Sequence, residues 1–222
     1  LNLPVNAVGK INGTANLSGR WDNPKVQGQF NVVEGILNRA KIQQATTQFD
    51  YDNARLAFNG LATIGSPEPI TVKGTVPYAL PFSAVKPKSN QVDIAMSVKD
   101  QGLALANLFT DQVAWVDGKG QLNLQVTGTV DRPLMKGALA FQNATLRSPS
   151  LTEPLTQVNT SIRFDSDRLT VESLTGRYNQ GQLTAAGNLP IFDNTLQLSN
   201  PLSVNLNNTA FNLKGLYRGQ AS

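Results

Sequence analysis

A ten-residue stretch occurs twice in this chain, and this repetition constrains the fold more than any other feature. The first copy runs from Gly19 to Gly28 (GRWDNPKVQG) and the second from Gly128 to Gly137 (GTVDRPLMKG), so the copies lie 109 positions apart. Gly, Asp, Pro and Gly recur at the same offsets. These are turn residues: Asp can hydrogen-bond its own backbone, Pro fixes φ, and Gly tolerates a positive φ. Since a fixed period decides the architecture, the stretch predicts a tandem repeat.

Apolar and polar residues alternate on both sides of each copy and along most of the chain. One example is the run from Val92 to Val98, in which Val, Ile, Met and Val alternate with Asp, Ala and Ser. Successive side chains of a strand point to opposite faces, so each alternating segment predicts a strand with one apolar and one polar face. Turn signals such as Asn59-Gly60 and Pro87-Lys88-Ser89-Asn90 separate these alternating segments. The sequence therefore predicts an all-β fold with a long antiparallel sheet.

Two further matches extend the repeat beyond the turn. The segment 49–56 (FDYDNARL) resembles 164–169 (FDSDRL), and 70–77 (ITVKGTVP) corresponds to 183–190 (LTAAGNLP). Two tandem units of about 110 residues follow, 1–110 and 111–222. Because no linker separates them, we expect one continuous domain over 1–222. Both ends of the sequence resemble cuts through a longer protein.

One segment departs from the period of two. Leu105, Leu108, Phe109 and Val113 fall at i, i+3, i+4 and i+8, which is a helical stripe. The spacing predicts a short helix near 103–110, where the first unit meets the second.

The composition excludes several functional classes. Charged residues make up 15% of the chain, against a typical ~25%, and there is no Cys or His. Disulfides, thiol chemistry and an ordinary catalytic triad are therefore excluded. The net charge is +4, but Lys and Arg occur mostly singly, so no nucleic-acid partner is predicted. No apolar run is long enough to span a bilayer, so we expect any membrane anchor to lie outside this fragment.

Two carboxylate pairs, Asp50/Asp52 and Asp165/Asp167, are the only candidates for chemistry. Side chains at i and i+2 of a strand share a face at about 6.5–7 Å, which suits a glycosidase pair or a cation site. Each pair, however, follows a Phe and precedes Arg-Leu, as expected of a hairpin turn. Turns recur in repeats and active sites seldom do. We therefore predict no enzyme, no catalytic residue, no metal and no cofactor.

A sheet of this size must hide its apolar face or use it. It can close into a sandwich filled by its own side chains, or curl into a trough whose apolar side stays open to a ligand. Composition does not separate these outcomes.

The second copy of the repeat resembles a known family signature. Its pattern is Gly118-x-Gly120-x-Leu122-x-Leu124-x-Val126-x-Gly128-Thr129-x-x-x-Pro133-x-x-x-Gly137-x-Leu139-x-Phe141-x-Asn143-Ala144. This is similar to the repeats of the TamB family, within the AsmA-like group, whose chloroplast relatives sit in the envelope. The resemblance implies a protein anchored in the inner membrane that crosses the periplasm of a bacterium such as a cyanobacterium. It also implies strands bent into a U-shaped trough (a β-taco), an outer-membrane barrel assembly partner that binds outside this fragment, and movement of phospholipid between membranes.

The leading hypothesis is a non-enzymatic lipid conduit whose apolar groove carries acyl chains. Two alternatives stay open: a scaffold that templates outer-membrane protein strands by β-augmentation, and a self-filled structural repeat. The residues predicted to line the groove are Leu17, Phe30, Val32, Ile70, Val72, Val92, Ile94, Met96, Val98, Leu122, Leu124, Val126, Leu139, Phe141, Ile162, Phe164, Leu196, Leu198, Val204 and Leu206.

Overall fold

Strands make up nearly all of the structure, which is a computed structural model describing residues 7–37, 40–64, 69–108, 112–191, 198–207, 209–213 and 217–221. In chain order the elements are β1 (Ala7–Arg20), β2 (Asn23–Leu37), β3 (Ala40–Asp52), β4 (Arg55–Thr63), β5 (Ile70–Pro77), β6 (Asp93–Lys99), the 3₁₀ helix η1 (Asp100–Leu108), β7 (Ala114–Gly128), β8 (Pro133–Arg147), β9 (Leu155–Ser166), β10 (Arg168–Tyr178), β11 (Gly181–Pro190), β12 (Ser203–Asn207), β13 (Thr209–Leu213) and β14 (Tyr217–Ala221).

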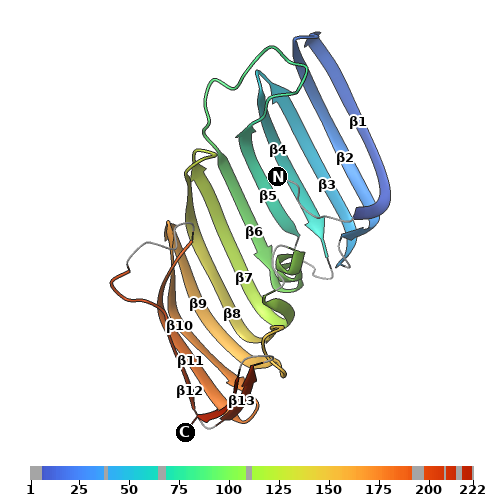
Figure 1. Cartoon of the computed structure of the whole chain (residues 1–222). Helices are drawn as coiled ribbons and strands as arrows, with labels where there is room; N and C mark the ends of the chain where they lie inside the picture. The colour runs from blue at the N-terminus through green and yellow to red at the C-terminus, as the bar shows by residue number, and fades with distance from the viewer. Residues whose placement is uncertain are drawn as a thin grey trace. The chain divides into compact units, whose positions relative to one another are not determined.

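The strands pair in the order in which they occur in the sequence. β1 to β12 form one 12-stranded sheet in which each strand is hydrogen-bonded to the next, and β13 pairs with β14 (Figure 1). The ladders described from β1 to β6 and from β9 to β12 are all antiparallel. The predicted all-β antiparallel fold is confirmed. Short hairpin connections explain the sequential order, because antiparallel neighbours need only a tight turn.

The chain divides into two compact units. Unit 1 comprises residues 1–98 and 124–135, and unit 2 comprises residues 99–123 and 136–222. Unit 1 therefore holds β1 to β6 and the β7–β8 turn, whereas unit 2 holds η1, most of β7 and β8, and the later strands. The division of the sequence into repeats near residue 110 stays a prediction, as does the single domain over 1–222.

The duplicated stretch forms the same hairpin in both copies. In the first, Arg20 pairs with Asn23 across a two-residue turn. In the second, Thr129 and Arg132 exchange backbone hydrogen bonds of 3.2 and 3.1 Å. The Gly that opens each copy has a positive φ, +82° at Gly19 and +87° at Gly128. The predicted strand–turn–strand unit is confirmed, and this glycine is required because other residues adopt that conformation only with strain.

We expect Gly128→Ala to lower the free energy of unfolding by about 1–2 kcal/mol. A Cβ at this position would lie 2.6 Å from the Arg132 carbonyl oxygen, in addition to the cost of the positive φ. Gly176→Ala is the control, because that glycine has no positive φ and its nearest atom, in the Val158 side chain, lies at 3.3 Å. Urea denaturation of both variants measures the difference. Equal losses would show that the turn conformation is not what Gly128 supplies.

The segments 49–56 and 164–169 also form equivalent hairpins. Asp52 pairs with Arg55 between β3 and β4, and Asp165 pairs with Arg168 between β9 and β10. A left-handed residue tightens both turns, with φ of +49° at Asn53 and +63° at Ser166. Asp52 and Asp165 therefore flank the turns, and Asp167 lies in one of them.

The predicted helix is present in part and differs in type. η1 begins at Asp100 and has 3₁₀ geometry, and its described part ends at Leu108; positions 109 and 110 lie outside the described residues. Leu103 is 4% exposed and packs over Gly120 of β7. Val113 is 47% exposed, so the predicted α-helical stripe is wrong at that position. The tighter turn changes which residues share a face, because 3₁₀ side chains repeat every three residues.

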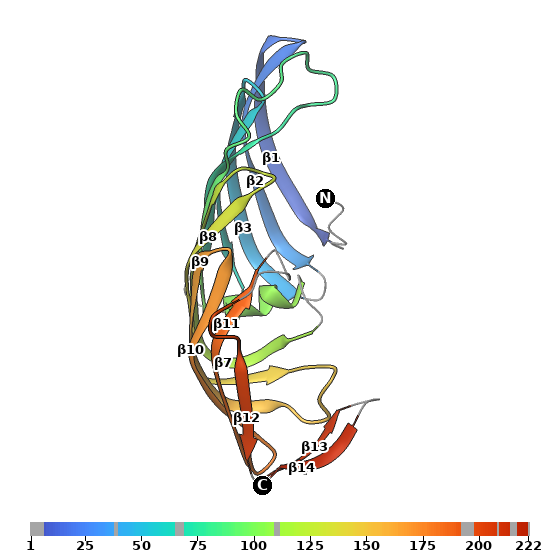
Figure 2. The ribbon, with the colours of Figure 1, turned by 60° about the vertical axis from the view of Figure 1, so that its left-hand side comes forward.

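Bulges bend the strands and shift their phase. The β10–β11 register slips between Val171 and Leu174, and Asn143 of β8 and Gln157 of β9 have positive φ. In unit 1, the β1–β2 register slips after Val8, and β1, β2 and β3 bow along their length (Figure 2). A bulge bends a strand and raises its local twist, so it gives a long strand curvature.

Candidate functional site

The ladder register gathers apolar side chains on one face of unit 1. Residues paired directly across an antiparallel ladder share a face. One row from β1 to β6 is Gly13, Phe30, Thr47, Gly60, Val72 and Met96. The next is Ala15, Gly28, Phe49, Phe58, Gly74 and Ile94. The flanking rows add Leu17, Val26, Tyr51, Leu56 and Val76 on one side, and Ile11, Val32, Ala45, Ala62 and Ile70 on the other. We call this surface the apolar face of unit 1.

Exposure on this face falls from the edge strand towards β5 and β6. On β1, Leu17 is 70% exposed and Ile11 67%, and Phe30 of β2 is 44% exposed. Ile70 of β5 and Val98 of β6 are 6% and 5% exposed. The β1–β2 part of the face is therefore open to solvent, and the β5–β6 part is covered.

Phenylalanine rings lie over glycines of the neighbouring strand. A Cβ on Gly13 would collide with the Phe30 ring, and one on Gly28 would lie 2.7 Å from the Phe49 ring. The Phe30 and Phe49 rings stack with centroids 5.1 Å apart and planes at 10°. The absent side chains leave room for the rings to lie flat against the sheet. The result is an even aromatic floor at the centre of the face.

The strand register brings together seven of the predicted groove residues on this face: Leu17, Phe30, Val32, Ile70, Val72, Ile94 and Met96. Val98 follows Met96 at i+2 on β6, and Leu124 and Val126 continue β7 within unit 1. Val92 precedes β6, where its N–H donates to the Gly128 carbonyl at 2.9 Å.

Sequence reasoning missed the contribution of β3 and β4. Phe49, Tyr51, Leu56 and Phe58 lie on the apolar face, and Tyr51 is 4% exposed. Small or polar residues point to the same face of these two strands and hide the apolar alternation in the sequence: Ala45, Thr47, Gly60 and Ala62. The turn predicted at Asn59-Gly60 is wrong, because both residues lie inside β4. A hairpin centred on Asn53–Ala54 pairs Phe49 with Phe58, and this symmetry is the signal that could have found these residues.

Unit 2 has an apolar face of its own. Ile162 pairs with Val171 and Phe164 with Leu169, and Val204 and Leu206 pair with Ala185 and Leu183. On β7 and β8, Leu122, Leu139 and Phe141 are half-buried, and the Phe141 ring lies 5.0 Å from that of Trp115. Leu198 lies outside the strands, and Leu196 lies outside the described residues.

The apolar face of unit 2 is more enclosed than that of unit 1. Val158, Val171 and Tyr178 are 1%, 5% and 2% exposed. Thr160, the buried polar residue there, donates its hydroxyl to the Ser173 carbonyl at 2.8 Å. Val204, on β12, is 57% exposed.

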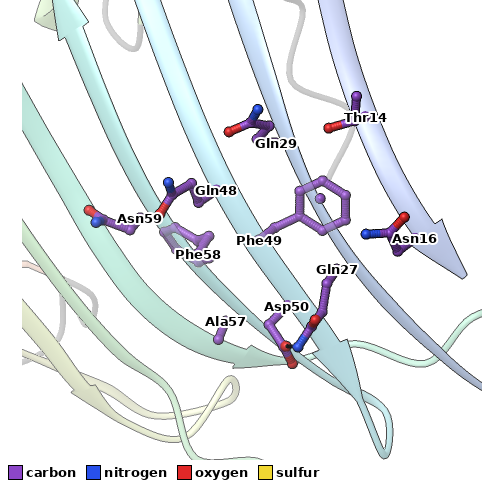
Figure 3. Close-up of a pocket in the computed structure, with 11 residues that line it drawn as sticks. Thr14, Asn16, Gln27, Gln29, Gln48, Phe49, Asp50, Ala57, Phe58 and Asn59 are labelled. Carbon is purple, nitrogen blue, oxygen red and sulfur yellow. Dashed lines mark hydrogen bonds between the residues drawn. The ribbon is translucent and has the colours of Figure 1, made fainter. Parts of the chain in front are cut away.

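The opposite face of unit 1 is polar and mostly uncharged. A hollow of about 520 Å³ lies on it, lined chiefly by the rows Thr14, Gln29, Gln48, Asn59 and Asn16, Gln27, Asp50, Ala57 (Figure 3).

The carboxylates singled out in the sequence have local partners. Gln27 donates to Asp50, and Lys25 forms an ion pair with Asp52 at 3.1 Å. Asp167 pairs with Arg168 at 3.7 Å. Asp50, Asp52 and Asp167 therefore have local partners, and Asp165 accepts from the Ser166 hydroxyl at 3.3 Å. No cluster of His, Cys, Asp or Glu in the described part of the chain could hold a metal ion.

Among the helices that the structure describes, none is both long and apolar enough to cross a membrane.

Two curated plant proteins are similar to about half of the chain. Protein TIC236, chloroplastic, of Arabidopsis thaliana is 35% identical over 107 residues, which is 48% of this chain and 5% of the relative. Protein SUBSTANDARD STARCH GRAIN 4, chloroplastic, of Oryza sativa subsp. japonica is 35% identical over 102 residues, 46% of this chain and 5% of the relative. The matches thus span about one twentieth of each relative. They support a TamB-like relation.

No family model matches the chain, and no solved structure matches it.

Proposed function

We propose that this chain is a segment of an envelope-spanning protein and that the apolar face of unit 1 binds the acyl chains of phospholipids. The observation that carries the proposal is the open aromatic and aliphatic surface over β1 and β2, where Leu17 and Phe30 are 70% and 44% exposed. An exposed apolar surface of this extent is a binding feature or a liability. The similarity to the two chloroplastic proteins and the TamB-like repeats favour the first reading, a surface that binds lipid.

The mechanism is partition. An acyl chain that moves from a bilayer to the apolar face stays out of water, and each buried CH₂ contributes about 0.8 kcal/mol relative to exposure. The headgroup stays in solvent beyond the strand ends. No bond is made or broken, so the proposed function needs neither a catalytic residue nor a cofactor.

The proposed location is the space between two envelope membranes. The full-length protein is anchored in the inner membrane and works with an outer-membrane barrel assembly protein, both through parts outside this chain. The TamB-like relation supports these statements.

Organic extraction of the purified chain, followed by mass spectrometry, tests the proposal. We expect co-purified phospholipid, which a fluorescent acyl-chain lipid then displaces in solution. Recovery of no phospholipid, together with no uptake of the fluorescent lipid, would contradict acyl-chain binding. The chain must be expressed in cells that supply envelope phospholipid and purified without detergent, because detergent would compete for the same face.

A specific observation favours a second candidate, the β-augmentation scaffold. In the described part of the chain β1 pairs with β2 alone, and its residues from Val8 to Arg20 are exposed. An unpaired edge of this length can accept a strand from another chain. Adjacent backbone N–H groups of a strand point to opposite edges, so one of the two variants Asn12→Pro and Gly13→Pro removes a donor from the free edge of β1. That variant should weaken strand addition and leave lipid binding in place.

A further inference from the structure

A long connection crosses the turn end of unit 1 and is tied to three hairpins. Residues 78–92 join β5 to β6. The backbone N–H of Tyr78 donates to the Ala54 carbonyl at 2.9 Å, and that of Ala84 to the Asp22 carbonyl at 3.0 Å. Near its other end the Asn90 carbonyl accepts from the Val130 N–H at 3.0 Å. The connection is thus fixed to the β1–β2, β3–β4 and β7–β8 turns.

Large apolar side chains project from this end into solvent. Trp21 is 77% exposed, Val130 57%, Tyr78 51% and Phe82 50%. The Trp21 and Phe82 rings stack with centroids 5.0 Å apart and planes at 23°. The Ser83 hydroxyl, which donates to the Asp22 carbonyl at 2.9 Å, holds this stack in place. We call Trp21, Tyr78, Phe82 and Val130 the aromatic rim.

The charges around the rim leave an excess of lysine. Arg20 is paired with Asp22 at 3.0 Å, and Lys25 with Asp52 at 3.1 Å. The hydrogen bond from Arg20 lowers the pKa of Asp22, so the first pair stays ionised at neutral pH.

Two cations are left over. Lys86 and Lys88, on the connection itself, are exposed and form no ion pair with any described residue. Asp131 and Arg132 on the β7–β8 turn offset each other. Arg55, at the β3–β4 turn, is a further cation at this end, and its guanidinium donates to the Gln91 carbonyl at 2.9 Å. The rim therefore combines exposed rings with the unpaired positive charges of Lys86 and Lys88.

We propose that the aromatic rim docks on the surface of a bilayer that contains anionic phospholipid. Trp and Tyr favour the headgroup level, where an apolar ring and a polar edge are both satisfied, and Phe and Val insert slightly deeper. Lysines beside them are attracted to anionic headgroups. The firm anchoring of the connection presents these side chains together. Docking does not depend on acyl-chain binding by the apolar face, although it would bring that face to its lipid source.

Vesicle binding by the whole chain tests the proposal. The probes are vesicles of phosphatidylcholine alone and of phosphatidylcholine with a quarter of phosphatidylglycerol. The chain contains two tryptophans, and Trp115 is 6% exposed, so a change in emission on binding reports Trp21. We expect a blue shift with the anionic vesicles, and quenching by brominated lipid. Trp21→Ala should remove the shift and weaken sedimentation with vesicles by about tenfold.

The charge contribution needs a matched control. Lys86→Glu with Lys88→Glu should weaken binding to anionic vesicles about tenfold or more. Lys41→Glu with Lys73→Glu makes the same change in net charge on exposed strand positions away from the rim and should have little effect. Circular dichroism confirms that each variant is folded.

Three outcomes would overturn the proposal. The first is no blue shift with either kind of vesicle. The second is an equal loss of vesicle binding in the Lys86→Glu/Lys88→Glu and Lys41→Glu/Lys73→Glu variants. The third is vesicle binding that Trp21→Ala leaves unchanged. The first outcome would favour another protein, and not a bilayer, as the binding partner of the aromatic rim. Phe30→Arg separates this proposal from the proposed function, because it should impair lipid extraction and leave vesicle docking intact.

Discussion

A chain carrying Val158→Asp is expected to lose the cooperative unfolding transition of unit 2. Val158 lies on β9 with 1% of its surface exposed, facing Gly176 of β10. Among the described side chains that pair around Val158 on this face none is a cation, so a carboxylate there must be buried unpaired or force the strands apart. The cost is about 4 kcal/mol or more, a large share of a total stability of about 5–15 kcal/mol.

Asn159→Asp is the matched control for this prediction. It adds the same charge one residue later, on the exposed side of β9. The Asn159 side-chain oxygen accepts from the Asn143 N–H at 3.0 Å, and a carboxylate keeps that role. The donation from the Asn159 amide to the Gln157 carbonyl at 2.9 Å is lost, so we expect a loss of about 1 kcal/mol, much smaller than that of Val158→Asp. If both variants unfold alike, added charge rather than burial at Val158 is responsible.

The two units differ in how far they fill their apolar faces, and this bears on the competing functions. Unit 2 buries Val158 and Tyr178 almost completely, as a self-filled structural repeat would. Unit 1 leaves Ile11, Leu17 and Phe30 well exposed, as a ligand-binding face would. A lipid-binding role therefore rests on unit 1, and the enclosed part of unit 2 serves stability.

Alternation along single strands predicted which side chains share a face in much of the sheet. The row from Ile94 to Val98 lies on β6 where the period of two places it, because the pleat fixes side-chain direction. The positions at which the buried side of a strand changes from one face to the other were not predictable in the same way. On β7, Gly118 has φ +122°, and burial passes from Trp115 on one phase to Leu122 on the other. A bulge of this kind depends on the neighbouring strand as much as on local sequence.

The rim was beyond sequence reasoning for a related reason. Pro87-Lys88-Ser89-Asn90 indicated a turn, but the contact between Ser83 and Asp22 joins residues 61 positions apart. Likewise, the period identified Phe30 as apolar, and its packing over Gly13 follows only from the β1–β2 register. Periodicity shows which side of a strand is apolar, whereas pairing shows what that side meets.

Phe30→Arg is expected to reduce acyl-chain binding by at least about tenfold, equivalent to about 1.4 kcal/mol, while the chain stays folded. Phe30 lies at the centre of the open part of the apolar face, stacked on Phe49. An acyl chain crossing this position would have to desolvate the guanidinium. The fold should survive because Phe30 is 44% exposed, so the Arg head can reach water while its stem covers Gly13. The lost ring stacking costs about 1 kcal/mol of stability.

The adjacent substitution Gln29→Arg supplies the control, since Gln29 lies on the polar face of the same strand and pairs with Thr14. It introduces the same charge and side chain one position away, on the opposite side of β2. Titration with a fluorescent phospholipid should show binding close to that of the unmodified chain for Gln29→Arg and a large loss for Phe30→Arg. Equal binding by the two variants would place the lipid elsewhere. Unfolding of Phe30→Arg would show that the β1–β2 surface is covered in solution, which would favour the self-filled repeat over the open face.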